Sequence, residues 1–513
     1  MCQLAAALGI DLGTSSVRAM LVARDGTPLA TASRTYPILA PHPGWAEQDP
    51  DAWWLAVCDA IAACRVAAPD AHVEAVSLSG QMHGTVLVDR RGTPIRPAII
   101  WADQRSAAEV DAFLARVGRD WLAAHTANPL ATGFQLATLL WLARHEPESL
   151  RALGTVLLPK DYLRGRMTGT WATEASDACS TLLFDTAARR WSDDVIAAAG
   201  VDPAWLPPAA EATDRAGEIV PAAAEATGLA AGTPVIMGAG DQPATAVGNG
   251  VTEPGQVLST IGSGGQLLAP ATDAAYDPLL RTHTFCHAAK DRWYVMGAIL
   301  SAGLSLRWLR DQVLAFATPK AAEALDYAAL SAMAAEVPPG AEGLIFLPYL
   351  TGERTPHLDP HACGVFFGLS PRHTAAHLAR AVMEGVVMAL AEGLDIMRDL
   401  GIAPERVIAA GGGARSILWR QIQADVYGCP VTTSAVEEQA AYGAALVAGA
   451  GIGWWPSVRD ACRACVRPGS EPLQPDARRR DFYAALRGLY RDLYPRLREA
   501  MAARARLVAL RVR

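Results

Sequence analysis

The sequence predicts an α/β protein of two related domains that face each other across a central cleft. A strand, a glycine turn and a second strand follow one another within residues 4–26, and the same order returns within 257–268. The chain has 513 residues, more than the ~250–300 over which a single hydrophobic core grows, so we expect the two units to belong to separate domains. We place these domains at 1–248 and 249–513.

The elements of the first domain follow from hydrophobic spacing and helix caps. Apolar side chains alternate along 17–21, as in a half-buried strand. A helix is expected over 49–67, because Asp49 is a preferred cap and Pro50 fits the first helical position. The other expected elements of this domain are a buried strand, a polar loop, a largely helical stretch and a last strand, at 73–79, 80–84, 107–150 and 233–237.

The second domain is expected to repeat the strand–turn–strand unit and to add a glycine turn between a strand and a helix within 407–416. The most apolar helix candidate, 378–396, is interrupted by charged residues and lacks the ~18 uninterrupted apolar residues of a membrane-spanning helix. The last 40 residues, from about 474, are predicted to form an Arg-rich helix exposed to solvent.

The basic residues of the chain are nearly all arginines. There are 45 Lys and Arg residues against 52 Asp and Glu, which gives a net charge of −7, and only three of the 45 are lysines. None of the three stands in the lysine-containing motif of a P-loop or of a protein kinase. These lysines are Lys160, Lys290 and Lys320. A nucleotide would therefore be bound largely without lysine.

Composition also narrows the cellular setting. The acidic balance argues against a protein that coats nucleic acid. The N-terminus has no basic region before its short apolar run, unlike a secretory signal peptide. The nine cysteines show no framework spacing, and the close pair Cys462 and Cys465 lacks the further ligands of a zinc site. We expect a cytoplasmic protein with reduced thiols and no membrane association.

Three glycine turns could bind a nucleotide. In DLGTSSVR (11–18), backbone N–H groups and hydroxyls are available to an anion, and Asp11 could hold Mg²⁺ through water. IGSGG (261–265) offers the same groups, and GGGARS (411–416) would admit a flat base close to the backbone. Each turn alone is better explained as a hairpin or as glycine at a positive φ. The three together favour a nucleotide.

Asp241 lies in GAGDQP (238–243), directly after the last expected strand of the first domain. It either caps a helix that begins near Pro243 or serves as a carboxylate at the carboxyl end of a strand, where open α/β sheets bind ligands. In the second role it could take the proton from an attacking hydroxyl during phosphoryl transfer. The local sequence leaves both alternatives open.

Polar loops that could hydrogen-bond a polyol occur at three positions, GQMHG (80–84), WADQR (101–105) and GERTPH (352–357). An isolated histidine such as His83 is more often part of a structural hydrogen bond than a ligand. In the second loop the alternative is an internal ion pair of Asp103 with Arg105. In the third it is an ion pair of Glu353 with Arg354. Composition alone does not choose between these alternatives.

Taken together, these motifs resemble the FGGY family of carbohydrate kinases and, within it, the xylulokinase branch. The resemblance extends from GIDLGTSSVR at the start of the chain to YGAAL at 442–446. Its further specific pieces are LLPKDYLRGRMTG (157–169), GVFFGL (364–369) and HLARAVME (377–384). The resemblance implies an actin-like ATPase (ribonuclease H-like) fold, whose two domains close around ATP and a sugar.

The resemblance also implies an activity and a role for each residue. The reaction would be the ATP-dependent phosphorylation of D-xylulose at its 5-hydroxyl, giving D-xylulose 5-phosphate and ADP. Asp241 would be the general base, and Asp11 would lie beside Mg²⁺ and the γ-phosphate. The expected sugar-site residues are Gln81, Met82, His83, Trp101, Asp103, Asp241 and Gln242. The expected nucleotide-site residues are Thr14, Ser15, Ser16 and Arg18 in the first phosphate turn, Gly262 and Ser263 in the second, Gly303, and Gly412, Gly413 and Ala414 beside the adenosine.

The sequence departs from the family pattern in several places. The second phosphate turn is Gly-Ser-Gly-Gly at 262–265 instead of the usual Gly-Thr-Ser-Gly, and Thr138 stands where the first signature carries a lysine. Asp241-Gln242 also resembles glycerol kinases, although their Arg-Glu pair is replaced here by Met82-His83. The Arg-rich tail beyond about 500 extends past the usual end of the family.

Three alternative functions follow from the same motifs. The first is a kinase for another ketose or polyol, such as ribulose or glycerol. The second is a non-catalytic switch protein that binds sugar and nucleotide on the same fold. The third, an actin-like polymer subunit, is disfavoured by the sugar-loop motifs. The expected partners are the sugar and ATP, with a homodimer as a candidate assembly and no nucleic acid or membrane.

Overall fold

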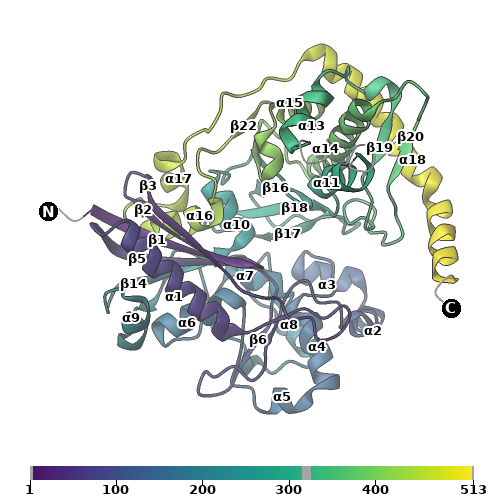
Figure 1. Ribbon diagram of the computed structural model, residues 1–513. Helices are drawn as coiled ribbons and strands as arrows, with labels where there is room; N and C mark the ends of the chain where they lie inside the picture. Colours follow the sequence, from purple (N-terminus) through teal and green to yellow (C-terminus); the bar gives the residue numbers. More distant parts are fainter. Residues whose placement is uncertain (1–3, 315–324, 511–513) are drawn as a thin grey trace.

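The computed structural model describes residues 4–314 and 325–510, so Lys320 lies outside the described residues. Two six-stranded sheets form the centres of two lobes, the lower and the upper lobe in Figure 1. The first sheet has the order β13-β14-β5-β1-β2-β3. Its strands are β1 (Leu4–Leu12), β2 (Ser16–Ala23), β3 (Pro28–Thr35), β5 (Ala71–Gly80), β13 (Arg215–Glu218) and β14 (Pro234–Gly240). Strands β1, β2 and β3 are antiparallel neighbours, whereas β1, β5 and β14 run parallel.

The second sheet repeats this arrangement in the order β17-β18-β16-β15-β21-β22. Its strands are β15 (Gln256–Ile261), β16 (Gly265–Ala271), β17 (His283–Cys286), β18 (Trp293–Ile299), β21 (Arg406–Ala410) and β22 (Val431–Thr433). Strands β15, β16 and β18 are antiparallel neighbours, and β15, β21 and β22 run parallel. Because five strands share order and direction in both sheets, the prediction of two related α/β domains is confirmed.

A largely helical insertion lies between β5 and β14, and the helical prediction for 107–150 is confirmed. Its helices are α2 (Ala107–Val117), α3 (Arg119–Thr126), α4 (Gln135–His145), α5 (Pro147–Arg151), α6 (Pro159–Thr168), α7 (Ala175–Ala178), α8 (Asp193–Ala199) and α9 (Pro221–Thr227), with 3₁₀ turns η1 (Cys179–Thr181) and η2 (Pro203–Trp205). Its short strands are β6 (Val86–Val88), β7 (Ala98–Ile99), β8 (Thr155–Leu157), β9 (Thr173–Glu174), β10 (Phe184–Asp185), β11 (Arg190–Trp191) and β12 (Ala209–Ala210). Strand β4 (Glu47–Gln48), which precedes β5 in the chain, pairs with β7.

Helices cover both sheets. Helix α1 (Pro50–Ala67) packs on β2 and β3, and Asp49 caps it by accepting the N–H of Asp51, as predicted. Helix α14 (Ala375–Asp399) packs on β16 and β18 of the second sheet. The remaining elements of this lobe are α11 (Gly303–Trp308), the π-helical turn η3 (Leu309–Leu314), α13 (Tyr327–Ala335), η4 (Ala341–Gly343), β19 (Ile345–Leu347), β20 (Val365–Phe367), η5 (Gly412–Arg415) and α15 (Ile417–Tyr427). Helix α17 (Val458–Cys465) packs on α16 and α10, beside the first sheet.

Two helices cross where the lobes meet. Helix α10 (Asp241–Gly248) packs against α16 (Gln439–Gly451), and α16 also packs on β1 and β5 of the first sheet. A Cβ on Gly443 would lie 1.9 Å from the carbonyl oxygen of Ala244, and a Cβ on Gly248 would lie 1.9 Å from that of Gln439. Only glycine therefore allows the two helix backbones to approach this closely.

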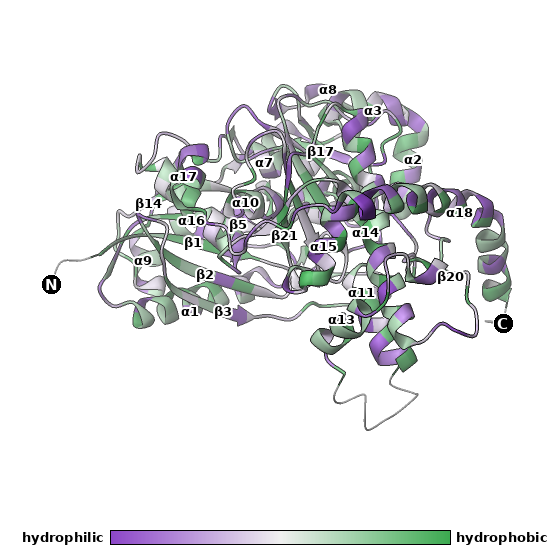
Figure 2. Cartoon of the chain, turned by 90° about the horizontal axis from the view of Figure 1, so that it is seen from above, coloured by the Kyte–Doolittle hydropathy of each residue, from purple (hydrophilic) through white to green (hydrophobic). Residues whose placement is uncertain are grey.

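The C-terminal helix α18 (Ala477–Leu510) runs along the outside of the second lobe, and its last turns extend beyond it (Figure 1). The helix is as predicted, but the expectation that it is solvated throughout is wrong. Along its length hydrophilic residues alternate with hydrophobic ones (Figure 2). Tyr483, Tyr490 and Met501 of this helix are buried in the core of the second lobe. Within the described residues, no helix is both long and apolar enough to cross a membrane.

Candidate active site

Asp11 and Asp241 flank the carboxyl end of β5, the strand between β1 and β14. Asp11 on β1 pairs in register with Ser79 of β5, and Gly240 at the end of β14 pairs with Gly80. Helix α10 starts directly after Gly240, so Asp241 is its first residue rather than its cap. Ser79 Oγ donates a 3.1 Å hydrogen bond to Asp11 Oδ1. The strand ends therefore bring together the two carboxylates selected from the sequence.

Both carboxyl groups bind their protons more tightly than usual. Burial raises the pKa of Asp11 to about 6, although the Ser79 hydrogen bond and the Arg18 charge oppose the shift. Burial raises the pKa of Asp241 to about 7; the negative charge of Asp11 adds to this effect, and hydrogen bonds from Gln242 oppose it. A carboxyl group that titrates near neutrality in a cleft can act as a general base, and two nearby carboxylates suit a divalent cation.

The GQMHG loop leaves β5 beside these carboxylates. Met82 is buried, and the hydroxyl of Tyr294 from the second lobe contacts its Sδ at 3.8 Å. The His83 N–H donates to Ser180 Oγ over 3.2 Å, and His83 Nδ1 lies 2.9 Å from the Ser180 carbonyl oxygen. Because a carbonyl only accepts, Nδ1 carries the hydrogen. Burial lowers the pKa of His83 to about 4, so the neutral ring keeps Nε2 as a hydrogen-bond acceptor.

A chain of hydrogen bonds connects the sugar loop to the first phosphate turn. Gln81 Nε2 donates to Gln48 Oε1 over 2.8 Å, and Gln48 Nε2 donates to the Thr14 carbonyl over 2.6 Å. Trp101 Nε1 donates to Thr14 Oγ1 over 2.9 Å. Gln81 Oε1 is buried and has no hydrogen-bond partner in the described part of the chain, so it can accept a bond from a ligand hydroxyl.

The carboxylates of the two charged loops have different partners. Asp103 forms a 2.7 Å ion pair with Arg105, which confirms that alternative. The alternative of an ion pair between Glu353 and Arg354 is wrong. Glu353 Oε1 instead accepts the backbone N–H groups of Leu300 and Arg354, over 3.0 and 2.7 Å. The ion pair of Asp103 and the two hydrogen bonds of Glu353 each stabilise their own loop. The contact of Asp103 with sugar stays a prediction.

Aromatic residues on the sugar side were not predicted from the sequence. The ring centroids of Phe134 and His83 lie 4.3 Å apart, and those of Phe134 and His283 lie 5.9 Å apart. A cavity of about 230 Å³ beside them is lined by both lobes and includes Arg354. Phe134 precedes the signature-like segment QLATLLWL, a signal that could have identified it. His283 lies in the second sheet, and it comes close to Phe134 only because the two lobes meet at this cavity.

The first phosphate turn is closed by the N–H of Gly13, which donates to the Ser16 carbonyl over 3.0 Å. Ser15 is exposed at the tip of the turn, where its hydroxyl and N–H can meet an anion. Arg18 forms a 2.6 Å ion pair with Glu438, the residue before α16. Its guanidinium therefore connects the lobes in this conformation, and its contact with phosphate stays a prediction.

The second phosphate turn and the start of α11 form one hydrogen-bonded unit. Gly262 N–H donates to the Gly264 carbonyl over 2.9 Å, and Gly303 N–H donates to the Gly262 carbonyl over 2.8 Å. A Cβ on Gly303 would lie 2.4 Å from that carbonyl oxygen, so this position requires glycine. The Ser263 carbonyl accepts the N–H groups of Ala302 and Leu304, which leaves the Ser263 hydroxyl available on the exposed side.

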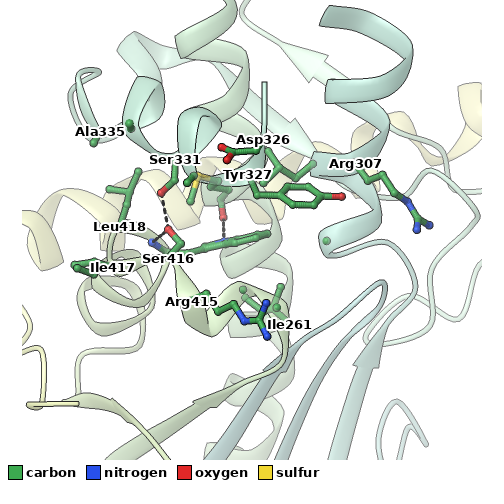
Figure 3. Close-up of a pocket in the computed structure, with 18 of the residues that line it drawn as sticks. Ile261, Arg307, Asp326, Tyr327, Ser331, Ala335, Arg415, Ser416, Ile417 and Leu418 are labelled. Carbon is green, nitrogen blue, oxygen red and sulfur yellow. Dashed lines mark hydrogen bonds between the residues drawn. The ribbon is translucent and has the colours of Figure 1, made fainter. Parts of the chain in front are cut away.

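A cavity of about 1080 Å³ opens beside this unit. It is lined by five of the residues predicted for the nucleotide, Gly262, Ser263, Gly303, Gly412 and Gly413. Ala414 belongs to the same turn, η5. Asp326 and Tyr327 lie on one side of the cavity and Arg415 to Leu418 on the other (Figure 3). A cleft of this size with apolar walls and a few polar groups suits a nucleoside.

The wall of the cavity formed by α13 was not predicted. Tyr327 and Ser331 line it from α13, and Arg307 lines it from α11. Ser331 Oγ lies 2.6 Å from Ser416 Oγ, which joins α13 to the cap of α15 (Figure 3). Residues 326–335 carry no glycine turn or family motif, so only long-range packing brings them to the site. Arg307 follows Gly303 by four residues, a spacing that keeps both on one helix face and could have identified it.

Thr138, where the family pattern carries a lysine, lies in a buried part of the fold. Thr138 is 2 % exposed within α4. A lysine here would bury its stem and ammonium group, whereas threonine leaves no charge to compensate. The other departure, at 262–265, keeps the hydroxyl of Ser263 on the cavity wall.

Known proteins share both the sequence and the fold of this chain. Family models described as the FGGY family of carbohydrate kinases, N-terminal and C-terminal domain, match residues 6–248 and 258–452. The chain is 39 % identical to a xylulose kinase of Escherichia coli over 496 residues, which cover 96 % of this chain and 100 % of that protein. It is 36 % identical to a xylulose kinase of Bacillus subtilis over 500 residues, which cover 97 % and 98 %.

Among solved structures, xylulose kinase from Rhodospirillum rubrum superposes with a TM-score of 0.89 at 35 % identity, covering 97 % of this chain and 100 % of that one. Glycerol kinase from Plasmodium falciparum shares the fold at 20 % identity, with a TM-score of 0.86 and a coverage of 96 % and 98 %. These similarities confirm the actin-like ATPase fold and the enzyme class, a sugar kinase. The chain belongs to the FGGY family of carbohydrate kinases.

Proposed function

We propose that this sugar kinase transfers the γ-phosphoryl group of ATP to the 5-hydroxyl of D-xylulose, giving D-xylulose 5-phosphate and ADP. The observation that carries the proposal is the placement of Asp11 and Asp241 on either side of the end of β5, next to the Met82–His83 loop. The similarity to xylulose kinases over nearly the whole chain supports the choice of sugar.

Asp241 takes the proton of the 5-hydroxyl while the hydroxyl oxygen bonds to the γ-phosphorus. The bond from this phosphorus to the bridging oxygen breaks, and ADP leaves. With a pKa of about 7, Asp241 is largely ionised just above neutral pH and accepts the proton readily. His83 Nε2 and Gln81 Oε1 accept hydrogen bonds from other sugar hydroxyls, and so orient the 5-hydroxyl toward the phosphate.

Asp11 is the residue that would hold Mg²⁺, which when bound neutralises charge on the phosphate oxygens. Ser79 donates to one carboxylate oxygen of Asp11, so the other oxygen would be available to hold the ion. The hydroxyls of the turns at 13–16 and 262–264, and those of their N–H groups that make no bond within the turn, contact the phosphates. This accounts for phosphate binding without the lysine of a P-loop. The cavity beside Gly412 receives the adenosine.

The domain boundary also becomes part of the proposal. We place the functional units at 1–248 and 249–513, which the family matches at 6–248 and 258–452 support. A cytoplasmic location, a homodimer and the absence of nucleic-acid or membrane partners stay predictions.

The test is ADP release measured with D-xylulose, D-ribulose and glycerol in parallel, for the unchanged protein and for Asp241→Asn. We expect D-xylulose to give the highest kcat/KM, and Asp241→Asn to lower kcat by about 10²–10⁴-fold. Asp120→Asn, at an exposed position of α3, is the matched control and is expected to leave turnover unchanged.

Each contrary result has a distinct meaning. A higher kcat/KM for ribulose or glycerol would replace the proposed sugar. Comparable turnover in Asp241→Asn would remove Asp241 as the base. Sugar binding without phosphoryl transfer to any of the three acceptors would favour a non-catalytic switch protein.

A further inference from the structure

Lys160 is the centre of a cluster of charged side chains in the first lobe that the mechanism has not used. Its Nζ lies 2.7 Å from Asp161 Oδ1, 3.2 Å from Glu174 Oε1 and 3.3 Å from Asp177 Oδ2. Arg164 Nη1 lies 2.9 Å from Asp161 Oδ1. All five side chains are at most 1 % exposed. We call these five residues the buried charge cluster.

The charges of this cluster are close to balance. Two cations face three carboxyl groups. Burial raises the pKa of Asp177 to about 8, although the charge of Lys160 opposes the shift. Burial also opposes the ionisation of Asp161, but the charges of Lys160 and Arg164 overcome it and lower the pKa of Asp161. The proton that Asp177 keeps near neutral pH therefore reduces the excess of carboxylate charge over the two cations. Because well-packed apolar side chains often stabilise a fold as well as a buried ionic cluster does, folding alone does not require it.

One arm of the cluster reaches the sugar loop. Asp177 Oδ1 accepts a 3.2 Å hydrogen bond from Ser180 Oγ. Ser180 Oγ accepts the His83 N–H, and the Ser180 carbonyl accepts the hydrogen of His83 Nδ1. Only one residue, Ser180, separates the cluster from His83. Its position therefore sets both the backbone and the ring of His83.

The other arm reaches the peptide that precedes the proposed base. Glu174 Oε2 accepts the Ser176 N–H over 2.7 Å, and Ser176 Oγ accepts the Gly240 N–H over 3.2 Å. Arg164 Nη1 also donates to the carbonyl of Met237 over 2.9 Å, on the same strand, β14. Asp241 follows Gly240 directly, so this arm fixes the start of α10.

We propose that Lys160 is a positioning residue of the kinase, which holds Glu174 and Asp177 together and thereby fixes the distance between His83 and Asp241. The proposal rests on the proposed function of this site. Lys160 contacts neither His83 nor Asp241 and acts on both through residues 174–180. Its ammonium group donates a hydrogen bond to Asp161 and makes short charge contacts with Glu174 and Asp177 from the same nitrogen. The planar guanidinium of arginine does not reproduce this compact geometry.

Two serine variants separate the arms while they leave the charges in place. Ser180→Ala removes the hydroxyl that links Asp177 to the His83 N–H but keeps the carbonyl that accepts from the His83 ring. We expect it to raise the sugar KM by about three- to ten-fold with a smaller change in kcat. Ser176→Ala removes the support of Gly240, and we expect it to lower kcat by a similar factor with little change in KM. Thr227→Val deletes a buried hydroxyl in α9 outside the site and serves as the control. Equal kinetics for all three variants and the unchanged protein would overturn the proposal.

A third variant tests Lys160 itself. Lys160→Met alone leaves uncompensated carboxylates and is expected to unfold readily. Combining it with Glu174→Gln leaves Arg164 opposite one ionised carboxylate and keeps an acceptor for Ser176. We expect this double variant to melt near the temperature of the unchanged protein but to turn over about 10²-fold more slowly, since a displacement of ~1 Å has this effect. A folded double variant with unchanged kcat and KM would overturn the proposal.

A readout that needs no sugar separates this inference from the proposed function. Amide hydrogen exchange of His83 and Gly240 is measured in the unliganded protein, because both N–H groups donate to serines next to the cluster. We expect faster exchange at both amides in the folded double variant and no change at Gly303. If the unchanged protein fails to phosphorylate any sugar while exchange responds as expected, the proposed function fails and the positioning role stands. Unchanged exchange at both amides would overturn that role.

Discussion

The indole N–H of Trp101 donates to Thr14 Oγ1 over 2.9 Å, which joins the sugar-side loop to the first phosphate turn. Trp101 is 40 % exposed, so the bond is made at the edge of the cleft rather than in the core. Because the indole occupies a lone pair of the Thr14 hydroxyl, the hydrogen of this hydroxyl is left free to be donated elsewhere. One contact thus holds the loop that is predicted to bind sugar against the turn that is predicted to bind phosphate.

Replacing Trp101 by Phe tests this coupling. The variant keeps the aromatic surface but removes the donor, so the turn at 13–16 loses one of its anchors. We expect kcat/KM to fall by about three- to ten-fold, the usual effect of one hydrogen bond. Trp454→Phe is the control, since it removes an indole donor to Glu74 outside the site. An equal effect of both substitutions would argue against a special role of Trp101.

The pH dependence of turnover should follow Asp241. Burial and the charge of Asp11 raise the pKa of Asp241 to about 7, and a general base is active only when it is ionised. We expect kcat/KM for the sugar to increase with pH and to reach half its maximum near pH 7, because this quantity reports on groups of the free enzyme. A profile that is flat between pH 5.5 and 8 would contradict the assignment.

Asp241 should also make the folded protein less stable at high pH. Its pKa is about 7 in the folded protein and 3.8 as a model value, so the folded state binds more protons between these values. The stability that this group contributes is present below pH 3.8 and is lost as the pH rises through 7. We expect Asp241→Asn to be more stable than the unchanged protein at pH 8 by about 1 kcal/mol, a figure reduced for partial exposure. Thermal melts should show that this gain shrinks at pH 5; a gain that is equal at both values would be inconsistent with the shift.

Gly303→Ala should weaken nucleotide binding selectively. The added methyl group would lie 2.4 Å from the Gly262 carbonyl oxygen and would push the second phosphate turn away from α11. We expect the KM for ATP to rise at least about ten-fold while the sugar KM stays the same. Gly488→Ala in α18 is the control, because a methyl group there meets nothing within 4 Å. A uniform loss of both affinities would point to unfolding of the lobe instead.

The buried face of α18 should matter for stability. The Tyr483 hydroxyl donates to Glu384 over 2.6 Å and accepts from Arg380 over 2.9 Å, with all three side chains buried. Tyr483→Phe leaves the paired charges without this partner, and we expect a loss of about 1–3 kcal/mol in thermal or urea unfolding. Tyr276→Phe, which removes a hydroxyl without a hydrogen-bond partner in the described residues, is expected to have no effect. A wild-type melting temperature for Tyr483→Phe would refute the prediction.

Local patterns in the sequence predicted individual helices and strands, because each pattern lies within a few residues of the element that it predicts. Asp49 and Pro50 mark the start of α1. The order of strand, glycine turn and strand marks the pairs β1–β2 and β15–β16. The glycine turn at 261–265 was recognised from its own residues, and the Gly262 carbonyl of this turn accepts the N–H of Gly303, a position that the family resemblance supplied. In these cases the residues that carry the signal also make the contact.

The parts of the site that were missed depend on contacts between distant segments. Tyr327 and Ser331 reach the nucleotide cavity only because α13 packs on α14. Ser180 supports His83 from a position nearly 100 residues away in the chain. For the loop of Glu353 the ion pair was one of two interpretations, and the backbone N–H of Leu300, directly after β18, binds Glu353 instead. Such pairings leave no mark at either position in a single sequence.

The crossing of α10 and α16 has a consequence for motion. Because the two backbones touch at Gly443 and Gly248, a clash blocks sliding of one helix past the other. We therefore expect any closure of the lobes to be a rotation about this contact rather than a sliding motion. Asp241 is the first residue of α10, so we expect it to move less in such a rotation than residues at the far rims of the lobes.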